Sequence, residues 1–308
     1  MLIELIWRKP GLRKPFWWLG YKVDYLAKVL RSGGQTMTVL FYPDRPALYS
    51  TLSQLCHIEG IRISTNPARP YDACIFWKDS TYCELDQTAA HIAAKSRMIN
   101  SRCLDISKKR VDVAHQNAFG YAMELDPTTQ SGAFLRKSNK NYAHDGLIMY
   151  GPITPQEADA AANNGYLFVK LINNGISVPN DNVPGPVSDY VQEFRVPYFD
   201  GTIPVCYVKY RPIKERFGSY NTNVNLADAK EVFSPTECSR IVDFCKDLGF
   251  DCGELDVLRD IDDGRIYIVD ANTTPWGPPR NTSANNSLES FRNCGAALID
   301  MCKKQRPL

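Results

Sequence analysis

The segment 251–280, DCGELDVLRDIDDGRIYIVDANTTPWGPPR, constrains the fold more than any other part of the chain. It reads as two β-strands joined by a tight acidic turn. Apolar and β-branched residues fill both strands, and the Asp-Gly pair at 263–264 is typical of a hairpin turn. The sequence therefore predicts an antiparallel hairpin here.

Oxygen-bearing side chains gather on this hairpin. Side chains alternate along a strand, so residues two apart should share a face. If the faces of the two strands coincide, carboxylates and a carboxamide meet, and such a set suits a Mg²⁺ ion that phosphates also hold. The alternative is an acidic hairpin whose carboxylates lie in water. The two expected sets are Glu254, Asp256 and Leu258 on the first strand and Ile268, Asp270 and Asn272 on the second.

In the first 100 residues, strand-like segments alternate with helical ones. This alternation favours a parallel α/β layer. No G-x-G-x-x-G motif is present, so a dinucleotide cofactor is not expected. We expect strands at 2–7, 36–42, 61–64 and 72–77, and helices at 23–30 and 47–57.

Three short patterns near the C-terminus occur in a fixed order: GELDVLRD, DGRIYIVDAN and TPWGPP. Together they resemble the ATP-grasp superfamily. The resemblance implies that Asp256, Asp270 and Asn272 bind Mg²⁺, with Mn²⁺ as an alternative, between the protein and the phosphates of ATP. Asp-Ala-Asn stands where Glu-x-Asn is commoner, which keeps the charge and the oxygen donors but shortens one arm.

The resemblance also implies a domain organisation. It predicts an α/β N-terminal domain followed by two α+β ATP-grasp halves with antiparallel sheets. The expected boundaries are 1–100 for the N-terminal pre-ATP-grasp domain, 101–172 for a small subdomain with a phosphate-covering loop, and 173–308 for a C-terminal subdomain with the metal site.

Lysines on the small subdomain are candidates for binding the phosphates of ATP. A strand at 132–137 ends in Lys137, beside a polar loop at 138–146, and a lysine at such a place presents a point charge to phosphate oxygens. The resemblance makes Lys137 the ATP-binding lysine. Lys108 or Lys109, where a helix begins, could also reach the phosphates, and we assign Lys109. A solvated helix face is the alternative.

The strand at 166–172 corresponds to the hinge of the ATP-grasp fold. By resemblance, Val169, Lys170 and Leu171 would contact adenine through main-chain groups and apolar cover. A buried edge strand without a ligand is an equally good interpretation of this segment alone.

A second hairpin is expected at 189–210, with its turn at Asp200-Gly201. By alternation, Glu193 and Arg195 share one face, and Tyr207, Lys209 and Arg211 share another. Positive charge would then lie across from the acidic hairpin, which suits a polyphosphate with its metal. Surface charge is the competing interpretation for any single residue. We assign catalytic roles to Arg195, Lys209 and Arg216, and ATP binding to Glu193.

The resemblance implies phosphoryl transfer from ATP to a small-molecule acceptor. In the larger branch of the superfamily the acceptor is a carboxylate, and an amine attacks the resulting acyl phosphate. We therefore predict a carboxylate-amine or amino-acid ligase. Peptide-forming relatives often carry arginine two residues before the first metal-binding acid, and this chain has Glu254 there. We accordingly assign a catalytic role to Glu254. The alternative function is a kinase that transfers the γ-phosphate to a hydroxyl group of a small molecule or glycan. The second alternative is a non-catalytic nucleotide-binding regulator.

The charge balance limits the other partners. With 36 basic and 34 acidic residues the chain has no strong pull toward nucleic acid or an anionic membrane. The ten cysteines contain no C-x-x-C pair, which favours reduced thiols and a cytoplasmic protein. The apolar run at 2–7 is too short for a signal peptide or a membrane span.

Overall fold

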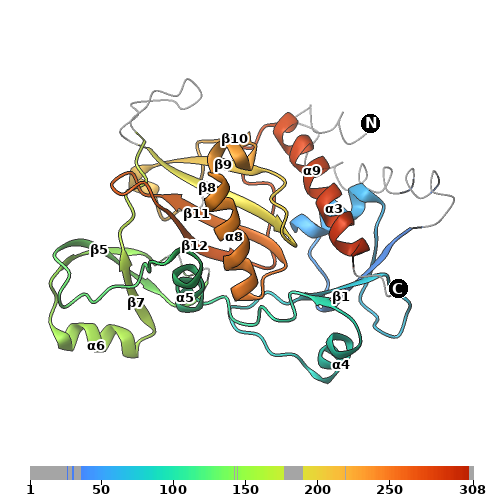
Figure 1. Ribbon diagram of the computed structural model, residues 1–308, viewed down its shortest axis with the longest axis horizontal. Helices are drawn as coiled ribbons and strands as arrows, with labels where there is room; N and C mark the ends of the chain where they lie inside the picture. Colours follow the sequence, from blue (N-terminus) through green and yellow to red (C-terminus); the bar gives the residue numbers. More distant parts are fainter. Residues whose placement is uncertain are drawn as a thin grey trace.

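The computed structural model describes residues 36–141, 143, 145–176, 190–218 and 220–304, with the isolated positions 26 and 30. Three β-sheets follow one another along the long axis of the molecule (Figure 1). The strand expected at 2–7 lies outside the described residues. Of the helix expected at 23–30, only positions 26 and 30 are described, and both are helical.

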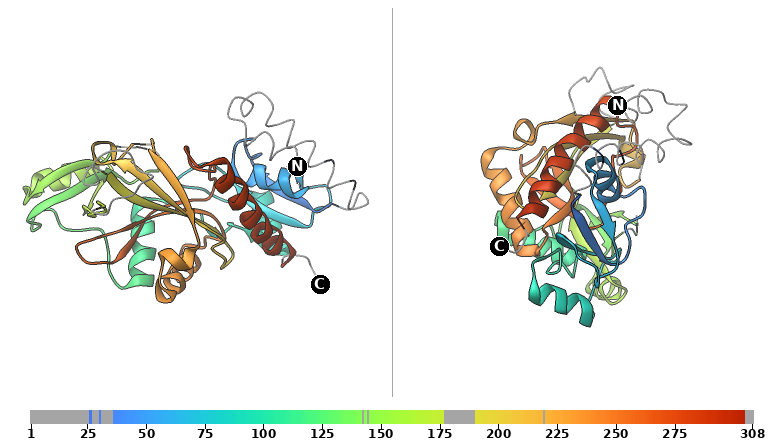
Figure 2. Two further views of the ribbon diagram at one scale, coloured as in Figure 1. Left: turned by 90° about the horizontal axis from the view of Figure 1, so that it is seen from above. Right: turned by 90° about the vertical axis from the view of Figure 1, so that its right-hand side faces the viewer.

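The first sheet is parallel, with the strand order β2-β1-β3-β4, as the alternation of strands and helices predicted. Helix α3 (Thr51–Glu59) and helix α9 (Ala284–Lys303) pack on one face, and helix α4 (Gln87–Lys95) packs on the other. Figure 2 shows α9 between this sheet and the rest of the molecule. The strands are β1 (Thr38–Pro43), β2 (Arg62–Ser64), β3 (Ala73–Trp77) and β4 (Met98–Ile99).

The second sheet is a small antiparallel one, with the order β6-β5-β7. It is formed by β5 (Gly132–Ser138), β6 (Leu147–Gly151) and β7 (Tyr166–Lys170), and helix α6 (Pro155–Asn163) leads into β7. The strand that ends near Lys137 therefore lies between the other two strands.

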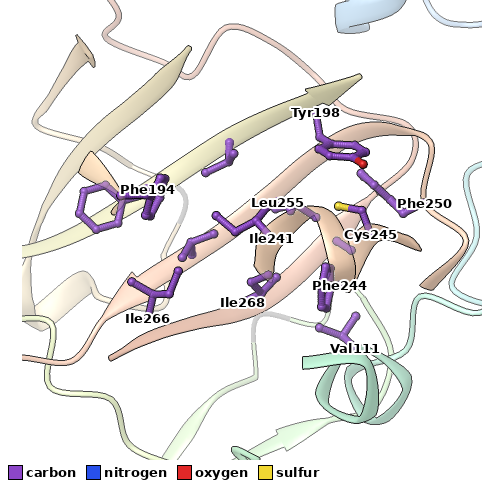
Figure 3. Packing of buried hydrophobic residues seen from close by; sticks show 14 of the residues in the cluster. Val111, Phe194, Tyr198, Ile241, Phe244, Cys245, Phe250, Leu255, Ile266 and Ile268 are labelled. Atoms are coloured by element: carbon purple, nitrogen blue, oxygen red, sulfur yellow. The ribbon is translucent and has the colours of Figure 1, made fainter. Parts of the chain in front are cut away.

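The third sheet is antiparallel and has five strands in the order β10-β9-β8-β11-β12. Helix α8 (Pro235–Leu248) and helix α5 (Lys108–Phe119) cover one face, and Figure 3 shows Ile241, Phe244 and Val111 against its apolar side chains. The strands are β8 (Tyr190–Phe199), β9 (Cys206–Pro212), β10 (Asn223–Ala227), β11 (Cys252–Arg259) and β12 (Ile266–Asn272); the short helices η3 (Ile213–Glu215) and α7 (Ala229–Val232) flank β10.

Two short sequences, TPQE at 154–157 and SPTE at 234–237, predict capping boxes with proline at the first helical position, and both helix starts are confirmed. Thr154 caps α6 and Ser234 caps α8, each with a glutamate three residues later that completes a capping box. The elements that were missed are α4, β6, β10 and the two short helices η3 and α7. Strands β6 and β10 are both edge strands, and β6 contains no buried residue although its sequence, LIMYG, is apolar.

One face assignment was wrong. The register of β11 and β12 shifts between Asp256 and Val257, so that Asp256 pairs with Asp270 while Val257 pairs with Ile268. The extra residue is Val269, and it reverses the alternation along β12. Ile268 consequently belongs to the core under α8, on the face opposite Asp270.

All ten cysteines are free thiols and eight of them are buried, where they pack as small apolar groups. Among the described residues, none of the helices combines the length and the apolar character needed to cross a lipid bilayer.

Candidate active site

A cleft of about 800 Å³ opens where the three-stranded sheet, the five-stranded sheet and α3 meet. Its wall brings together residues that are far apart in the sequence. Of the predicted site residues, those that line it are Lys137, Val169, Lys170, Leu171, Glu193, Arg195, Lys209, Arg216, Asp256 and Asp270. Lys109, Glu254 and Asn272 do not line it.

The charged part of the cleft lies on the face of the five-stranded sheet that is opposite α5 and α8, beyond the part of this face that α9 covers. Glu193 lies opposite Lys209, and Arg195 lies opposite Tyr207 on one side and Asp256 on the other. The two sets of residues that were expected on separate faces therefore share one face. The pleat explains this, because each residue that points to the cleft alternates with one that points into the core under α8.

Asp256 is held by two cations. Its carboxylate accepts hydrogen bonds from Arg195 Nε at 3.0 Å and Nη2 at 3.2 Å, and from Lys209 Nζ at 3.1 Å. Burial alone would raise the pKa of Asp256, but the charges of Arg195 and Lys209 hold it well below its usual value. The side chain of Lys209 is 2% exposed and also pairs with Glu193, which in turn contacts Arg211.

The expectation that the cations face the acidic hairpin across a gap was wrong. Strand β8 lies between β9 and β11, so the cations of β8 and β9 stand beside Asp256 on the same surface. The result is an alternating network of acids and bases. Each buried charge then has a partner, which limits the energetic penalty of burial.

A second cluster of cations comes from α5 and β5. Lys108 Nζ lies 2.7 Å from Asp270 Oδ1, and Lys108 lines the cleft. Burial and, to a smaller extent, the neighbouring charge of Lys108 lower the pKa of Lys137 to about 8, against the opposite effect of Asp270. Lys137 forms no hydrogen bond or ion pair with another described residue.

Of the two adjacent lysines on α5, the wrong one was assigned. Lys109 is 59% exposed and lies 3.8 Å from Glu124, outside the cleft. Successive residues on a helix point about 100° apart, so only one of the pair can face the cleft. That residue is Lys108.

An apolar slot adjoins the charged part of the cleft. Val169 on β7 packs with Met123, Leu258 and Val269, and all four line the cleft. Of these, only Val169 was singled out from the sequence. The bulge at Val269 is what brings an apolar side chain to this face beside Asp270.

Lys170 belongs to the hinge strand and ties it to the turn of the acidic hairpin. Its Nζ lies 2.7 Å from Asp260 and 2.7 Å from Asp263, and it donates to Tyr267 Oη at 3.1 Å. Burial alone would lower the pKa of Lys170, but these hydrogen bonds raise it above its ordinary value. Leu171 follows at the cleft wall.

Arg216 also lines the cleft. Its guanidinium donates hydrogen bonds to Ile172 O at 2.7 Å and to Asn174 Oδ1 at 2.9 Å, and burial lowers the pKa of Arg216.

Glu254 lies behind the cleft wall. It is 4% exposed, accepts a hydrogen bond from Thr51 Oγ1 at 3.2 Å, and lies 3.6 Å from Arg195 Nε. Burial raises the pKa of its carboxyl group to about 7, although Arg195 opposes the shift. Gly277 separates it from the cleft, because a Cβ there would come 3.4 Å from Glu254 Oε1. A direct catalytic contact therefore has no support in this arrangement.

The predicted metal ligands lie on neighbouring positions of β11 and β12. Asp256 is directly opposite Asp270, and Asn272 Oδ1 already accepts from Thr274 N at 2.9 Å. Among the described residues, no group of three or more acidic, histidine or cysteine side chains is arranged to hold a metal alone. Two carboxylates and an amide oxygen do match the few ligands that Mg²⁺ takes when phosphates supply the rest. The donor set thus fits a metal that arrives with a nucleotide.

Other residues of the wall were missed. Lys140 and Arg280 line the cleft and form no ion pair with another described residue. The segment 276–280 supplies much of the wall next to α3, together with Tyr49 and Gln54. The Trp-Gly-Pro-Pro sequence belongs to the third of the three C-terminal patterns, but nothing in it indicates that it meets α3.

Comparison with family models and with curated protein sequences finds no match. Solved structures do match. The ATP-grasp ligase PsnB complexed with a minimal precursor is 13% identical, with 87% of this chain and 100% of that chain covered and a TM-score of 0.54. PsnB complexed with minimal precursor, Mg and ADP is 13% identical, with 87% and 98% covered and a TM-score of 0.53.

These matches show that the chain has the ATP-grasp fold. The predicted fold class, an α/β N-terminal domain with two ATP-grasp halves that contain antiparallel sheets, is confirmed. The boundaries at 1–100, 101–172 and 173–308 and the roles of the individual site residues stay predictions.

Proposed function

We propose that this protein is an ATP- and Mg²⁺-dependent ligase, which activates a carboxylate as an acyl phosphate and joins it to an amine. One observation carries the proposal: a single cleft contains an apolar slot, the three lysines Lys108, Lys137 and Lys140, and two adjacent carboxylates. The parts of the cleft match the parts of ATP with its metal: the apolar slot suits the base, the lysines suit the phosphates, and the carboxylates suit the metal that the phosphates bind. The ATP-grasp fold of the chain agrees with this reading.

The slot formed by Met123, Val169, Leu258 and Val269 would cover adenine, and the main chain at Lys170 and Leu171 would face its edge. The triphosphate would then extend toward Lys108, Lys137 and Lys140. Mg²⁺ would be held by Asp256 and Asp270, which line the cleft, and would neutralise charge on the phosphates. Asn272, which does not line the cleft, would join them only by releasing Thr274 N from its Oδ1.

The reaction has two steps. In the first, an oxygen of the acceptor carboxylate attacks the γ-phosphorus, the bond to the β-γ bridging oxygen breaks, and ADP leaves. In the second, the amine attacks the acyl carbon, phosphate leaves, and the nitrogen loses a proton to give an amide. The fixed charges of Arg195 and Lys209 would stabilise the oxygens as negative charge moves, without reorganising during the reaction.

Binding is tested by thermal unfolding with and without Mg²⁺ and ATP. We expect the ligands to raise the melting temperature of the wild-type protein and to have little effect on Asp270→Ala. Asp243→Ala is the matched control, because the side chain of Asp243 is 55% exposed and its one ion pair among the described residues is with Lys246 on α8. If the ligands leave the melting temperature of the wild type unchanged, the nucleotide assignment is wrong.

The class of reaction is tested by ADP release with pools of carboxylic acids, followed by trapping with hydroxylamine. A hydroxamate product supports an acyl phosphate and hence the ligase. A stable phosphate ester formed from an alcohol or sugar would instead identify a kinase. ATP binding without turnover for every acceptor would identify a regulatory protein.

A further inference from the structure

Two aromatic side chains stand on the cleft wall next to α3. Tyr49 is 55% exposed and Trp276 is 53% exposed, and both line the cleft. We call this pair the aromatic wall. Tyr49 precedes α3 and Ser50 forms a β-bridge with Trp276, whereas the apolar slot includes Val169 on β7. Figure 1 shows α3 and β7 on opposite sides of the five-stranded sheet.

The aromatic wall is held in place by buried hydrogen bonds. Gln54, which is 5% exposed, donates from Nε2 to Tyr49 O at 2.8 Å and to Gly277 O at 3.0 Å. In addition, Thr51 N donates to Pro275 O at 2.9 Å, and Ser50 forms a β-bridge with Trp276. One buried carboxamide thus joins two segments that each carry an exposed ring.

This arrangement does not serve the core. Trp77, the other tryptophan among the described residues, is 4% exposed and packs in the apolar cluster beneath α3. Trp276 is 53% exposed and lines the cleft, and the neighbouring Pro275 and Pro278 limit the backbone freedom of its segment. An exposed aromatic ring on a cleft wall can stack on a planar ring of a ligand.

A cation accompanies the aromatic wall. Arg280, four residues after Trp276, also lines the cleft and forms no hydrogen bond or ion pair with another described residue. A guanidinium that no described carboxylate neutralises suits an anionic ligand. The ring surface and this cation together suit a ligand that is both planar and negatively charged.

We propose that the acceptor of this enzyme is a carboxylic acid that carries a planar aromatic ring, with the ring against Trp276 and Tyr49 and the acid's charge balanced by Arg280. The inference rests on the proposed ligase function and specifies its substrate class. Gln54 is then a positioning residue, since it acts through the two segments that it joins.

The test compares acids of matched size in the presence of ATP, Mg²⁺ and hydroxylamine. The nitrogen of hydroxylamine attacks the acyl carbon, phosphate leaves and a proton is lost, so each activated acid is recorded as its hydroxamate. We expect kcat/KM for 3-phenylpropanoate and indole-3-propanoate to exceed that for 3-cyclohexylpropanoate by roughly 10-fold, because the cyclohexyl ring matches the volume but has no flat face.

Variants locate the effect. Trp276→Ala should raise KM for the aromatic acids roughly 10-fold and leave KM for ATP unchanged, whereas Trp276→Phe should restore most of the affinity. Gln54→Leu should raise the same KM with little change in kcat. Tyr150→Ala is the control, because Tyr150 is 76% exposed on β6 and does not line the cleft.

The outcomes separate this inference from the proposed function. Equal kcat/KM for the phenyl and cyclohexyl acids, or hydroxamate from aliphatic acids alone, would overturn the aromatic acceptor while the ligase stands. Binding of ATP without hydroxamate from any aromatic acid would also overturn it. Failure to bind ATP at all would remove the proposed function itself.

Discussion

Lys108 and Lys109 offer a matched pair of substitutions on one turn of α5. Lys108 is 13% exposed, lines the cleft and lies 2.7 Å from Asp270, whereas Lys109 is 59% exposed and lies 3.8 Å from Glu124. Replacement of each lysine by methionine keeps the apolar stem and removes only the charge. We expect Lys108→Met to weaken binding of Mg²⁺ and ATP, and Lys109→Met to leave it nearly unchanged.

The magnitude follows from the environment of each charge. A lysine 4 Å from a phosphate charge gains about 4 kcal/mol at an effective dielectric constant of about 20. Lys108 must give up part of its contact with Asp270 to do so, and the net value of a hydrogen bond to a charged group is about 1.5–3 kcal/mol. That range corresponds to a roughly 10- to 100-fold higher Kd. An exposed ion pair such as that of Lys109 contributes only about 0–1 kcal/mol.

The assay is isothermal titration calorimetry with a non-hydrolysable ATP analogue and Mg²⁺, at one fixed salt concentration because surface charge effects are screened by salt. Circular dichroism melts of both variants would show that the fold is retained. Equal losses of affinity, or a larger loss for Lys109→Met, would refute the placement of the phosphates beside Lys108.

Three further substitutions test the electrostatics of the cleft. The pKa of Lys137 is about 8, so affinity for ATP should fall as pH rises through 8 in the wild type and stay nearly flat in Lys137→Arg, as measured by the same titration over pH 7–10. Asp256→Asn leaves Arg195 and Lys209 without their shared carboxylate, so it should lower the free energy of unfolding, measured by urea denaturation, by about 3 kcal/mol. A loss below about 1 kcal/mol would contradict a tightly paired network. The pKa of Glu254 is raised from 4.5 to about 7, so between these pH values the folded state keeps this carboxyl group protonated while the unfolded state loses the proton. The stabilisation that the protonated carboxyl group provides is therefore complete below pH 4.5 and is lost by pH 7. Glu254→Gln should remove up to about 3 kcal/mol of this dependence, and an unchanged pH profile would show that the carboxyl group titrates normally.

Local chemistry in the sequence predicted those features that depend on neighbouring residues. The capping boxes at Thr154 and Ser234 start their helices because the capping hydrogen bonds are made within four residues. Alternation also placed Glu193 and Arg195 together, since the pleat has a period of two. The ATP-grasp fold followed from three short patterns in order.

Features that depend on long-range packing could not be predicted in this way. The order of strands sets β8 beside β11 and so places Arg195 against Asp256, but no local pattern specifies that order. The bulge at Val269 moves one residue across the sheet without any turn or glycine signal. The choice between Lys108 and Lys109 depends on the phase of α5, which cannot be fixed when a helix boundary is uncertain by one residue.

The network of paired charges also explains how the cleft can hold so many ionised groups near one another. Asp256 remains ionised because Arg195 and Lys209 lower its pKa, and these cations are in turn neutralised by Asp256 and Glu193. Under the proposed function, a nucleotide with its metal would exchange one set of opposite charges for another, because Asp270 would hold the metal and Lys108, now paired with Asp270, would be available to a phosphate. The penalty for burying charge is therefore met mainly during folding, by pairing, and little of it remains to oppose ligand binding.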